Sequence, residues 1–115
     1  MRKLSLSLLT LSLGVALLPL AQAATTPAQE HLLEQVRLGE ASNREDLVRQ
    51  SLYRLELIDP NNPELIAARM RYLLRQGDAA GAQNELERLT KLAPDSPELK
   101  ASRNEMKSNT GEGRQ

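Results

Sequence analysis

The sequence predicts an all-α fold, a short α-solenoid of helical hairpins, and the spacing of its prolines is the first evidence. The spacing from Pro60 to Pro94 is the same as that from Pro63 to Pro97. The same offset aligns apolar residues in pairs: Leu32 with Ile66, Leu52 with Leu86, Leu55 with Leu89, and Ile58 with Leu92. A period of about 34 residues in which proline closes each unit is typical of tetratricopeptide repeats, whose unit is a pair of helices.

The first hairpin is predicted over residues 26–58. Thr26 can cap its first helix, Pro27 suits the first helical position and Gln29 completes a capping box. Gly39 weakens this helix near its end. A second capping box, Ser42-Asn43-Arg44-Glu45, is expected to start the second helix. The residues expected to face inward are Leu32, Leu33 and Val36 in the first helix and Val48, Leu52 and Leu55 in the second.

The second hairpin is predicted over residues 63–92. Asn62 caps its first helix, Gly77 ends that helix in the left-handed conformation, and Asp78 caps the next one. Ala82 occupies the slot where this repeat places a small residue, so that two helices can approach closely. Val48 fills the equivalent slot of the first hairpin, which is therefore expected to pack slightly wider. The predicted inward stripe is Ile66, Met70, Leu73 and Leu74, followed by Ala82, Leu86 and Leu89.

A fifth helix is predicted to start at Ser96-Pro97. Lys100, Asn104 and Lys107 stand where the third helix has apolar residues, which leaves a stripe of only Leu99 and Met106. The helix could be the polar cap that a solenoid needs at its end, or the transition into a further repeat. The repeat segment is thus predicted over residues 24–107, and the Gly-rich, polar stretch 108–115 is predicted to be disordered.

Residues 1–23 are predicted to be a cleaved signal peptide. Arg2 and Lys3 precede an uncharged apolar run over residues 4–20, and Ala21-Gln22-Ala23 supplies the small residues of a cleavage site. The alternative is a membrane anchor, but the run is short for a span and no basic cluster follows it. We therefore expect the chain to be exported to the periplasm, with no membrane span left in the mature fragment.

The composition excludes most chemistry. Basic and acidic residues balance at 15 each, so no summed field attracts nucleic acid. There is no Cys, one His, no Phe and no Trp, which argues against thiolate chemistry, a metal centre and a base-stacking platform. His31 and Glu34 share a helix face without a third ligand and are interpreted as surface residues. The sequence predicts no enzyme, no cofactor and no metal.

Two charged residues of the third helix are the candidate site. Arg71 and Arg75 are four positions apart and share a face, which in tetratricopeptide arrays lines the concave groove. They could bind an acidic or hydroxyl-rich partner, although a solvated helix face is the commoner use of such residues. Tyr53 and Tyr72 each lie one step off the apolar stripe and are predicted to pack between helices.

Two segments go beyond the repeat consensus: QSLYRLELIDPNNPE over residues 50–64 and LLRQGDAAGAQNELERL over residues 73–89. They resemble the N-terminal region of the cellulose synthase operon protein C family, the outer-membrane proteins that export cellulose. The leader segment and the tail SNTGEGRQ are similar as well. The resemblance implies a non-catalytic periplasmic scaffold for cellulose biosynthesis and polysaccharide export, and a chain that is a fragment of a longer exporter.

The resemblance also implies partners. These are other subunits of the cellulose synthase complex, reached by protein–protein interaction, or further repeats of the same exporter, with the cellulose chain as a further candidate ligand. A different hypothesis stays open beside it, in which the chain is a free-standing periplasmic tetratricopeptide adaptor that binds a protein partner. No catalytic residue is carried over under either hypothesis.

Overall fold

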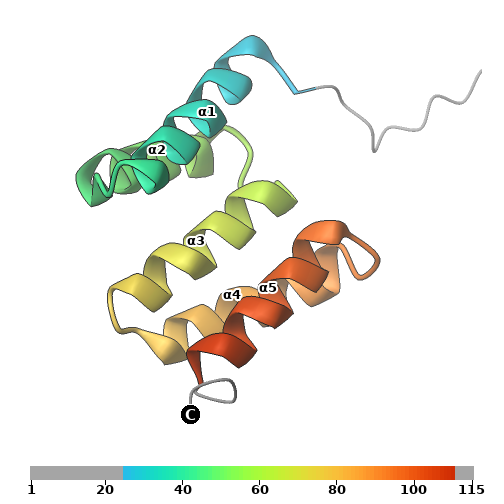
Figure 1. Ribbon diagram of the computed structural model, residues 1–115. Coiled ribbons are helices and arrows are strands. Elements are labelled where there is room, and N and C mark those ends of the chain that lie inside the picture. Colours follow the sequence, from blue (N-terminus) through green and yellow to red (C-terminus); the bar gives the residue numbers. More distant parts are fainter. Residues whose placement is uncertain (1–24, 111–115) are drawn as a thin grey trace, which may run out of the picture.

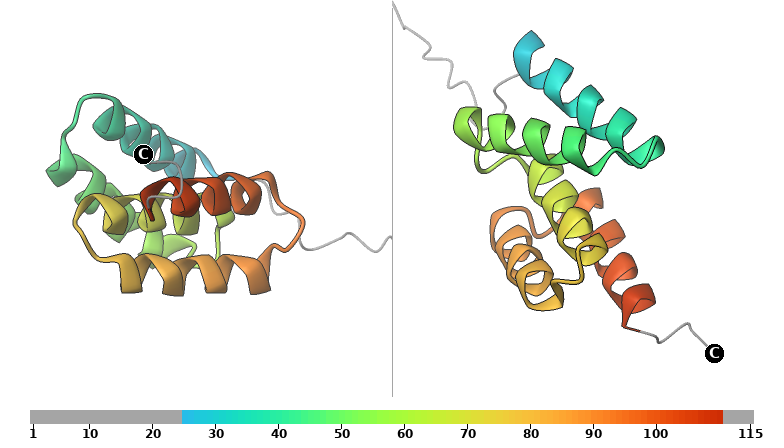
Figure 2. Two further views of the ribbon diagram at one scale, coloured as in Figure 1. Left: turned by 60° about the horizontal axis from the view of Figure 1, so that its bottom comes forward. Right: turned by 90° about the vertical axis from the view of Figure 1, so that its left-hand side faces the viewer.

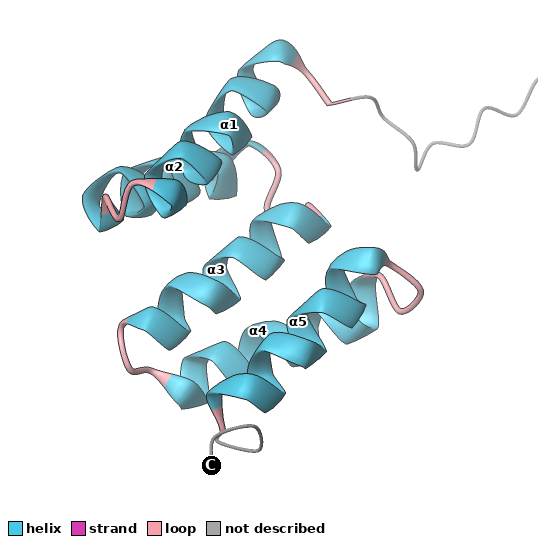
Figure 3. Ribbon diagram, viewed as in Figure 1, coloured by secondary structure: helices cyan, strands magenta, loops and turns pink. Residues whose placement is uncertain are grey.

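The structure is a computed structural model, which describes residues 25–110. Over these residues it contains helices and loops only (Figure 3). The five helices are α1 (Pro27–Ala41), α2 (Glu45–Ile58), α3 (Pro63–Arg75), α4 (Ala79–Leu92) and α5 (Pro97–Asn109). The predicted all-α fold of two hairpins and a fifth helix is confirmed (Figure 1).

Side-chain caps hold most of the helix starts. Thr26 and Gln29 form the predicted capping box of α1. Asn62 Oδ1 accepts the backbone N–H of Glu64 at 2.8 Å, and it also accepts that of Leu65. The side chain of Asp78 caps the start of α4, and that of Ser96 caps the start of α5. Proline occupies the first position of α1, α3 and α5.

The start of α2 differs from the prediction, because Ser42 does not cap it. The Ser42 hydroxyl donates to the carbonyl oxygen of Leu38, one helical turn earlier, at 2.6 Å, and so belongs to the end of α1. Asn43 then turns the chain with a φ of 56°. Arg44 occupies the N-cap position, and its side chain makes no cap hydrogen bond. The second capping box was therefore a wrong interpretation.

Helix α3 is the centre of the molecule, since it contacts each of the other four described helices. Figure 2 shows it between the α1–α2 hairpin and the α4–α5 pair. Leu65 and Ala68 belong to a first hydrophobic core with residues of α1 and α2. Ile66 and Ala67 belong to a second core with Leu89 of α4 and Leu99 of α5. The two cores therefore meet in one helix.

Most predicted inward residues are buried, and several residues that had not been predicted are buried as well. Those of the first hairpin, together with Ile66, Met70, Ala82 and Leu89, are buried, whereas Leu73, Leu74 and Leu86 are half-buried. Leu65, Ala68 and Gly39 are also buried. Leu65 and Ala68 face the preceding hairpin, a contact that the pattern within one repeat does not reveal.

Gly39 explains how α1 accommodates Val48 on α2. A Cβ on Gly39 would lie 2.7 Å from Val48 Cγ2, which is closer than carbon atoms pack. The positions of the second hairpin that are equivalent by the repeat offset hold Leu73 and Ala82. The first hairpin thus has its small residue, Gly39, on the first helix and its larger one on the second, and the second hairpin has the reverse. Gly39 thereby leaves room for Val48, whose bulk was expected to widen the first hairpin.

Helix α5 packs against α3 and α4. Leu99 is buried as predicted, and so is Ser102, at the position equivalent to Ala68. The helix continues through Ser108 and Asn109, so the stretch predicted as disordered from residue 108 begins with helix. Residues 111–115 lie outside the described residues, as does the predicted signal peptide with its cleavage site at residue 23. Between residues 25 and 110, no helix is long and apolar enough to cross a membrane.

Candidate interaction site on the third helix

The predicted site residues Arg71 and Arg75 lie in the last two turns of α3, one turn apart. Helices α1 and α3 run in the same direction (Figure 1), so their C-terminal ends are neighbours. That end of α1 carries Glu40, and the short loop after it leads to Glu45 in the first turn of α2. The topology therefore places two carboxylates beside the two guanidinium groups.

Both arginines form ion pairs with these carboxylates. Arg71 donates from Nε and Nη2 to the two oxygens of Glu40, at 2.8 and 3.1 Å. Arg75 donates in the same two-pronged way to Glu45, at 2.5 and 3.0 Å, and from Nη1 to Glu40 at 3.3 Å. Glu40 is thus shared. This planar, two-bond geometry is the strongest form of an arginine–carboxylate pair.

The local electrostatics support the arrangement. The hydrogen bond that Arg75 donates to Glu45 raises the pKa of Arg75, against a smaller opposing effect of burial. Glu45 lies at the N-terminus of α2 and Arg75 at the C-terminus of α3, where the helix dipoles favour their charges. Glu40 lies near the C-terminus of α1, where the helix dipole disfavours a negative charge, and the two arginines offset this repulsion.

Arg71 and Arg75 also line a hollow between α3 and α5. It measures about 400 Å³, and its other lining residues are Leu74, Glu105, Ser108 and Asn109. The structure thus brings the two predicted residues together at a surface that a partner can reach. It also gives both of them partners within the chain, which sequence reasoning missed. The repeat itself could have indicated these partners, because the first helices of successive hairpins run parallel and this places residues 40–45 beside residues 71–75.

A second group of ion pairs joins the helices elsewhere along α3. Arg69 lies 3.7 Å from Glu56 of α2 and 3.5 Å from Glu85 of α4. Arg88 of α4 pairs with Glu85 at 3.2 Å, approaches Glu56 at 3.8 Å and donates to the carbonyl oxygen of Pro60. Charged side chains therefore link the first hairpin to the α3–α4 hairpin in two places.

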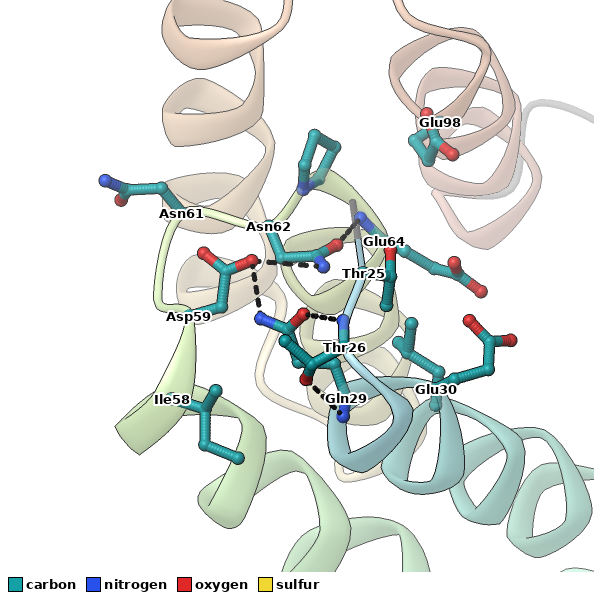
Figure 4. A pocket seen from close by; sticks show the side chains of 12 residues that line it. Thr25, Thr26, Gln29, Glu30, Ile58, Asp59, Asn61, Asn62, Glu64 and Glu98 are labelled. Carbon is teal, nitrogen blue, oxygen red and sulfur yellow. Dashed lines mark hydrogen bonds between the residues drawn. The ribbon is translucent and has the colours of Figure 1, made fainter. Parts of the chain in front are cut away.

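A polar hollow of about 620 Å³ lies where α1, α3 and α5 begin, and it was not predicted (Figure 4). Gln29 is buried there. Its Oε1 accepts the backbone N–H of Thr26 at 2.7 Å, and its Nε2 donates to Asp59 at 3.2 Å. Asp59 also accepts a bond from Asn62 at 3.4 Å. These bonds tie the α2–α3 loop to the start of α1, which fixes the first hairpin against α3.

The other candidate residues named from the sequence, His31, Glu34, Tyr53 and Tyr72, do not all come together in one site within residues 25–110. His31 and Glu34 are exposed on α1. Nowhere in residues 25–110 do three His, Cys, Asp or Glu side chains gather as a metal-binding group. Tyr72 packs against the first core as predicted, whereas Tyr53 is exposed, so its predicted packing between helices was wrong.

Comparisons with known proteins agree with the fold. No protein-family model matches the chain. It is 64% identical over 115 residues to cellulose synthase operon protein C of Escherichia coli (strain K12). It is 67% identical over 114 residues to the protein of that name from Salmonella typhimurium (strain LT2). The chain spans about a tenth of the length of these relatives, 10% in each case.

A solved structure carries the comparison to three dimensions. The crystal structure of the flexible tandem repeat domain of the C component of bacterial cellulose synthase superposes with a TM-score of 0.73 at 66% sequence identity. The match covers 77% of this chain and 41% of that one. In sequence and in backbone, this chain is therefore a close relative of a helical-repeat portion of cellulose synthase operon protein C.

Proposed function

We propose that this chain is a non-catalytic scaffold segment of the bacterial machinery that makes and exports cellulose. In this proposal it works in the periplasm, as a portion of the outer-membrane exporter. The observation that carries the proposal is identity of 64% or more to cellulose synthase operon protein C, spread over the whole chain. The helical hairpins support a scaffold role, because repeat arrays hold partners along an extended surface.

The proposed partners are other subunits of the cellulose synthase complex, further repeats of the same exporter, or the cellulose chain. Arg71 and Arg75 are the proposed contact residues. A carboxylate- or hydroxyl-rich partner would enter the hollow of about 400 Å³ between α3 and α5 and bind donors of the two guanidinium groups. Because Glu40 and Glu45 already neutralise part of their charge, a partner with hydroxyl groups suits the site as well as an acidic one.

A segment exchange tests the proposal. The matching tenth of the Escherichia coli protein is replaced by this chain, and cellulose export is measured by dye binding in cells that lack the native protein. We expect export to be retained. The control is an unrelated pair of tetratricopeptide hairpins of the same length at the same position, which should abolish export. If both replacements export equally well, or neither does, the chain has no specific part in the exporter.

Localisation is tested separately. The full chain, carrying a C-terminal epitope, is expressed in the same bacterium, and the periplasm is released by osmotic shock. The proposal expects the epitope in the periplasmic fraction, on a product that begins at Ala24. An intact product retained in the inner membrane would contradict both the periplasmic site and the cleavage.

A further inference from the structure

Helix α2 exposes an apolar pair to solvent. Tyr53 is 65% exposed and Leu57 is 68% exposed, one helical turn apart. Arg49 and Arg54 lie beside them, and these four residues with Gln50 line an open hollow of about 570 Å³. We call Arg49, Tyr53, Arg54 and Leu57 the α2 patch. Contiguous exposed apolar surface with a polar rim is a common mark of an interaction site.

Packing does not account for the α2 patch. Helix α2 already buries a full stripe, with Val48, Leu52 and Leu55 in the first core. It contacts α1 and α3, and Tyr53 and Leu57 face neither of them to any large extent, since about two thirds of each is exposed. Their apolar area therefore contributes little to the stability of the described chain.

The second hairpin provides an internal comparison. On α4, the positions that the repeat offset makes equivalent to Arg49, Tyr53 and Leu57 hold Gln83, Glu87 and Lys91. These three residues are exposed and polar, as the outer face of a surface helix normally is. The apolar pair is therefore not a requirement of the repeat, and the first hairpin carries it in addition to what the fold needs.

The two charged residues of the α2 patch are both positive. Over residues 25–110, neither Arg49 nor Arg54 forms an ion pair. The carboxylates of α2 approach other arginines: Glu45 pairs with Arg75, Asp46 with Arg44, and Glu56 lies near Arg69 and Arg88. The patch thus combines an aromatic and an aliphatic side chain with two uncompensated positive charges, and Tyr and Arg are the residues that dominate protein–protein hot spots.

A groove beside the patch gives it depth. It measures about 190 Å³ and is lined by Arg49, Leu52, Tyr53 and Glu56 of α2 and by Arg69, Tyr72 and Leu73 of α3. The Glu56 carboxylate lies 3.7 Å from the Arg69 guanidinium, which offsets its charge. This is smaller than small-molecule sites, which typically occupy about 300–1,000 Å³. Its size suits one apolar side chain, the anchor that helix-in-groove recognition uses.

We propose that the α2 patch docks a short, acidic, amphipathic helix of a partner protein. One apolar side chain enters the groove between Tyr53 and Tyr72, a second lies on Leu57, and carboxylates of the partner pair with Arg49 and Arg54. The patch extends over about two helical turns, or about 12 Å at 1.5 Å per residue, which a partner helix of similar length can cover. This proposal does not depend on Arg71, Arg75 or the cellulose machinery.

A membrane surface fits the patch less well. Membrane-surface helices bury a continuous apolar face, and lipid-binding clusters carry about four to eight basic residues. The α2 patch has two of each kind, and Val48, Leu52 and Leu55 of the same helix are buried in the hairpin. The small number of basic residues and the limited apolar area therefore favour a protein segment.

The test uses the full chain and a synthetic helical peptide with leucines at i and i+4 flanked by glutamates. Binding is followed by NMR chemical shifts. We expect shifts at Arg49, Tyr53 and Leu57, and affinity at least about tenfold weaker for Tyr53→Ala and Leu57→Ala, as for hot-spot residues. The matched controls Glu87→Ala and Lys91→Ala, on α4, should change it less than twofold. Circular dichroism verifies that all four variants remain helical, which is expected because the substituted side chains are exposed.

Two comparisons can overturn the proposal. A peptide with the same leucines and lysines in place of the glutamates should bind at least tenfold more weakly, and equal binding would remove the role of Arg49 and Arg54. Anionic phospholipid vesicles should not bind the chain in a Tyr53-dependent way. Tyr53-dependent vesicle binding, absence of peptide binding, or shifts confined to other helices would each refute the proposed protein-docking surface.

Discussion

The methyl group of Val48 on α2 occupies the space that a side chain on Gly39 of α1 would need. The two helices meet there, with Val48 fully buried and Gly39 in contact with it. Val48 Cγ2 lies 2.7 Å from the Cβ position of residue 39, and the carbonyl oxygen of Arg44 lies 3.2 Å from it. Because valine is stiff at its first side-chain torsion, it cannot move aside easily.

Gly39→Ala should therefore destabilise the protein although alanine favours helices. Overpacking costs about 1–3 kcal/mol, and the gain in helix propensity is about 1 kcal/mol, so we expect a net loss of about 1 kcal/mol in the free energy of unfolding. In a Val48→Ala background the same change should cost at least about 1 kcal/mol less, as coupled neighbours do. Urea unfolding of the four proteins of this cycle measures the coupling. Purely additive effects would mean that the two positions do not touch.

Leu65 and Ile66 should affect different halves of the molecule. Each is fully buried, Leu65 in the first core and Ile66 in the second. Removing either side chain to Cβ should cost about 2–5 kcal/mol. In native-state hydrogen exchange, Leu65→Ala should accelerate amides of α1 and α2 more than those of α4 and α5, and Ile66→Ala should do the reverse. Each variant is the control for the other, and identical exchange patterns would show one cooperative unit.

The ion pairs of Arg75 should stabilise the contact between the hairpins. Its side chain and that of Glu45 are about one-third exposed, so we expect Arg75→Ala to cost about 1 kcal/mol, the upper end for such pairs. The cost should fall as sodium chloride is raised, because screening weakens exposed pairs. Arg103→Ala is the control, since Arg103 is exposed and forms no ion pair within the described helices. A salt-independent cost would assign the effect to lost packing.

The pH dependence of that contribution follows from the raised pKa of Arg75. A group whose pKa is higher in the folded state contributes stability that is present below its unfolded pKa and is lost only above it. For an arginine this loss lies far above working pH. The difference in unfolding free energy between the parent and Arg75→Ala should therefore be equal at pH 6 and pH 9, as thermal melts at both values will measure.

Asp46 offers a site-specific titration. The side chain of Arg44 hydrogen-bonds its carboxylate at 3.1 and 3.2 Å and lowers the pKa of Asp46 below that of an ordinary aspartate. The stabilisation by this pair is then present above the ordinary pKa and is lost as the pH falls through the lowered one. Carbon-detected NMR should find the low midpoint, and Arg44→Ala should move it upward. An unchanged midpoint would show that the pair does not persist in solution.

The helices themselves could be predicted because their signals are local. Proline at the first position with Thr26, Asn62 or Ser96 before it fixes three of the five starts within a few neighbouring positions of the sequence. The prediction that Ser42 caps α2 was wrong because it, too, relied on local sequence alone. Its neighbours resemble a capping box, but Asn43 reverses the chain one position later and leaves Ser42 on the preceding helix.

The candidate site could be predicted only in part. Arg71 and Arg75 were placed on one face by helical periodicity alone. Their partners Glu40 and Glu45 lie far earlier in the sequence, in the preceding hairpin, and pairing them requires knowing how one hairpin stacks on the next. The burial of Leu65 and Ala68 depends on the same stacking. The prediction for Tyr53 was wrong for a different reason. A position one step from the apolar stripe can face either the neighbouring helix or solvent, and the sequence does not distinguish the two.

The double role of α3 affects how the protein is made. A chain emerges from the ribosome, or from a translocation channel, with its N-terminal end first. Residues of α1 and α2 are then free to pair, but their core lacks Leu65 and Ala68 until the first turns of α3 have followed. The core of the first hairpin therefore cannot be completed until the stretch from Asp59 to Ala68 has been released. Until then, part of the apolar surface of the hairpin remains exposed and can be bound by chaperones.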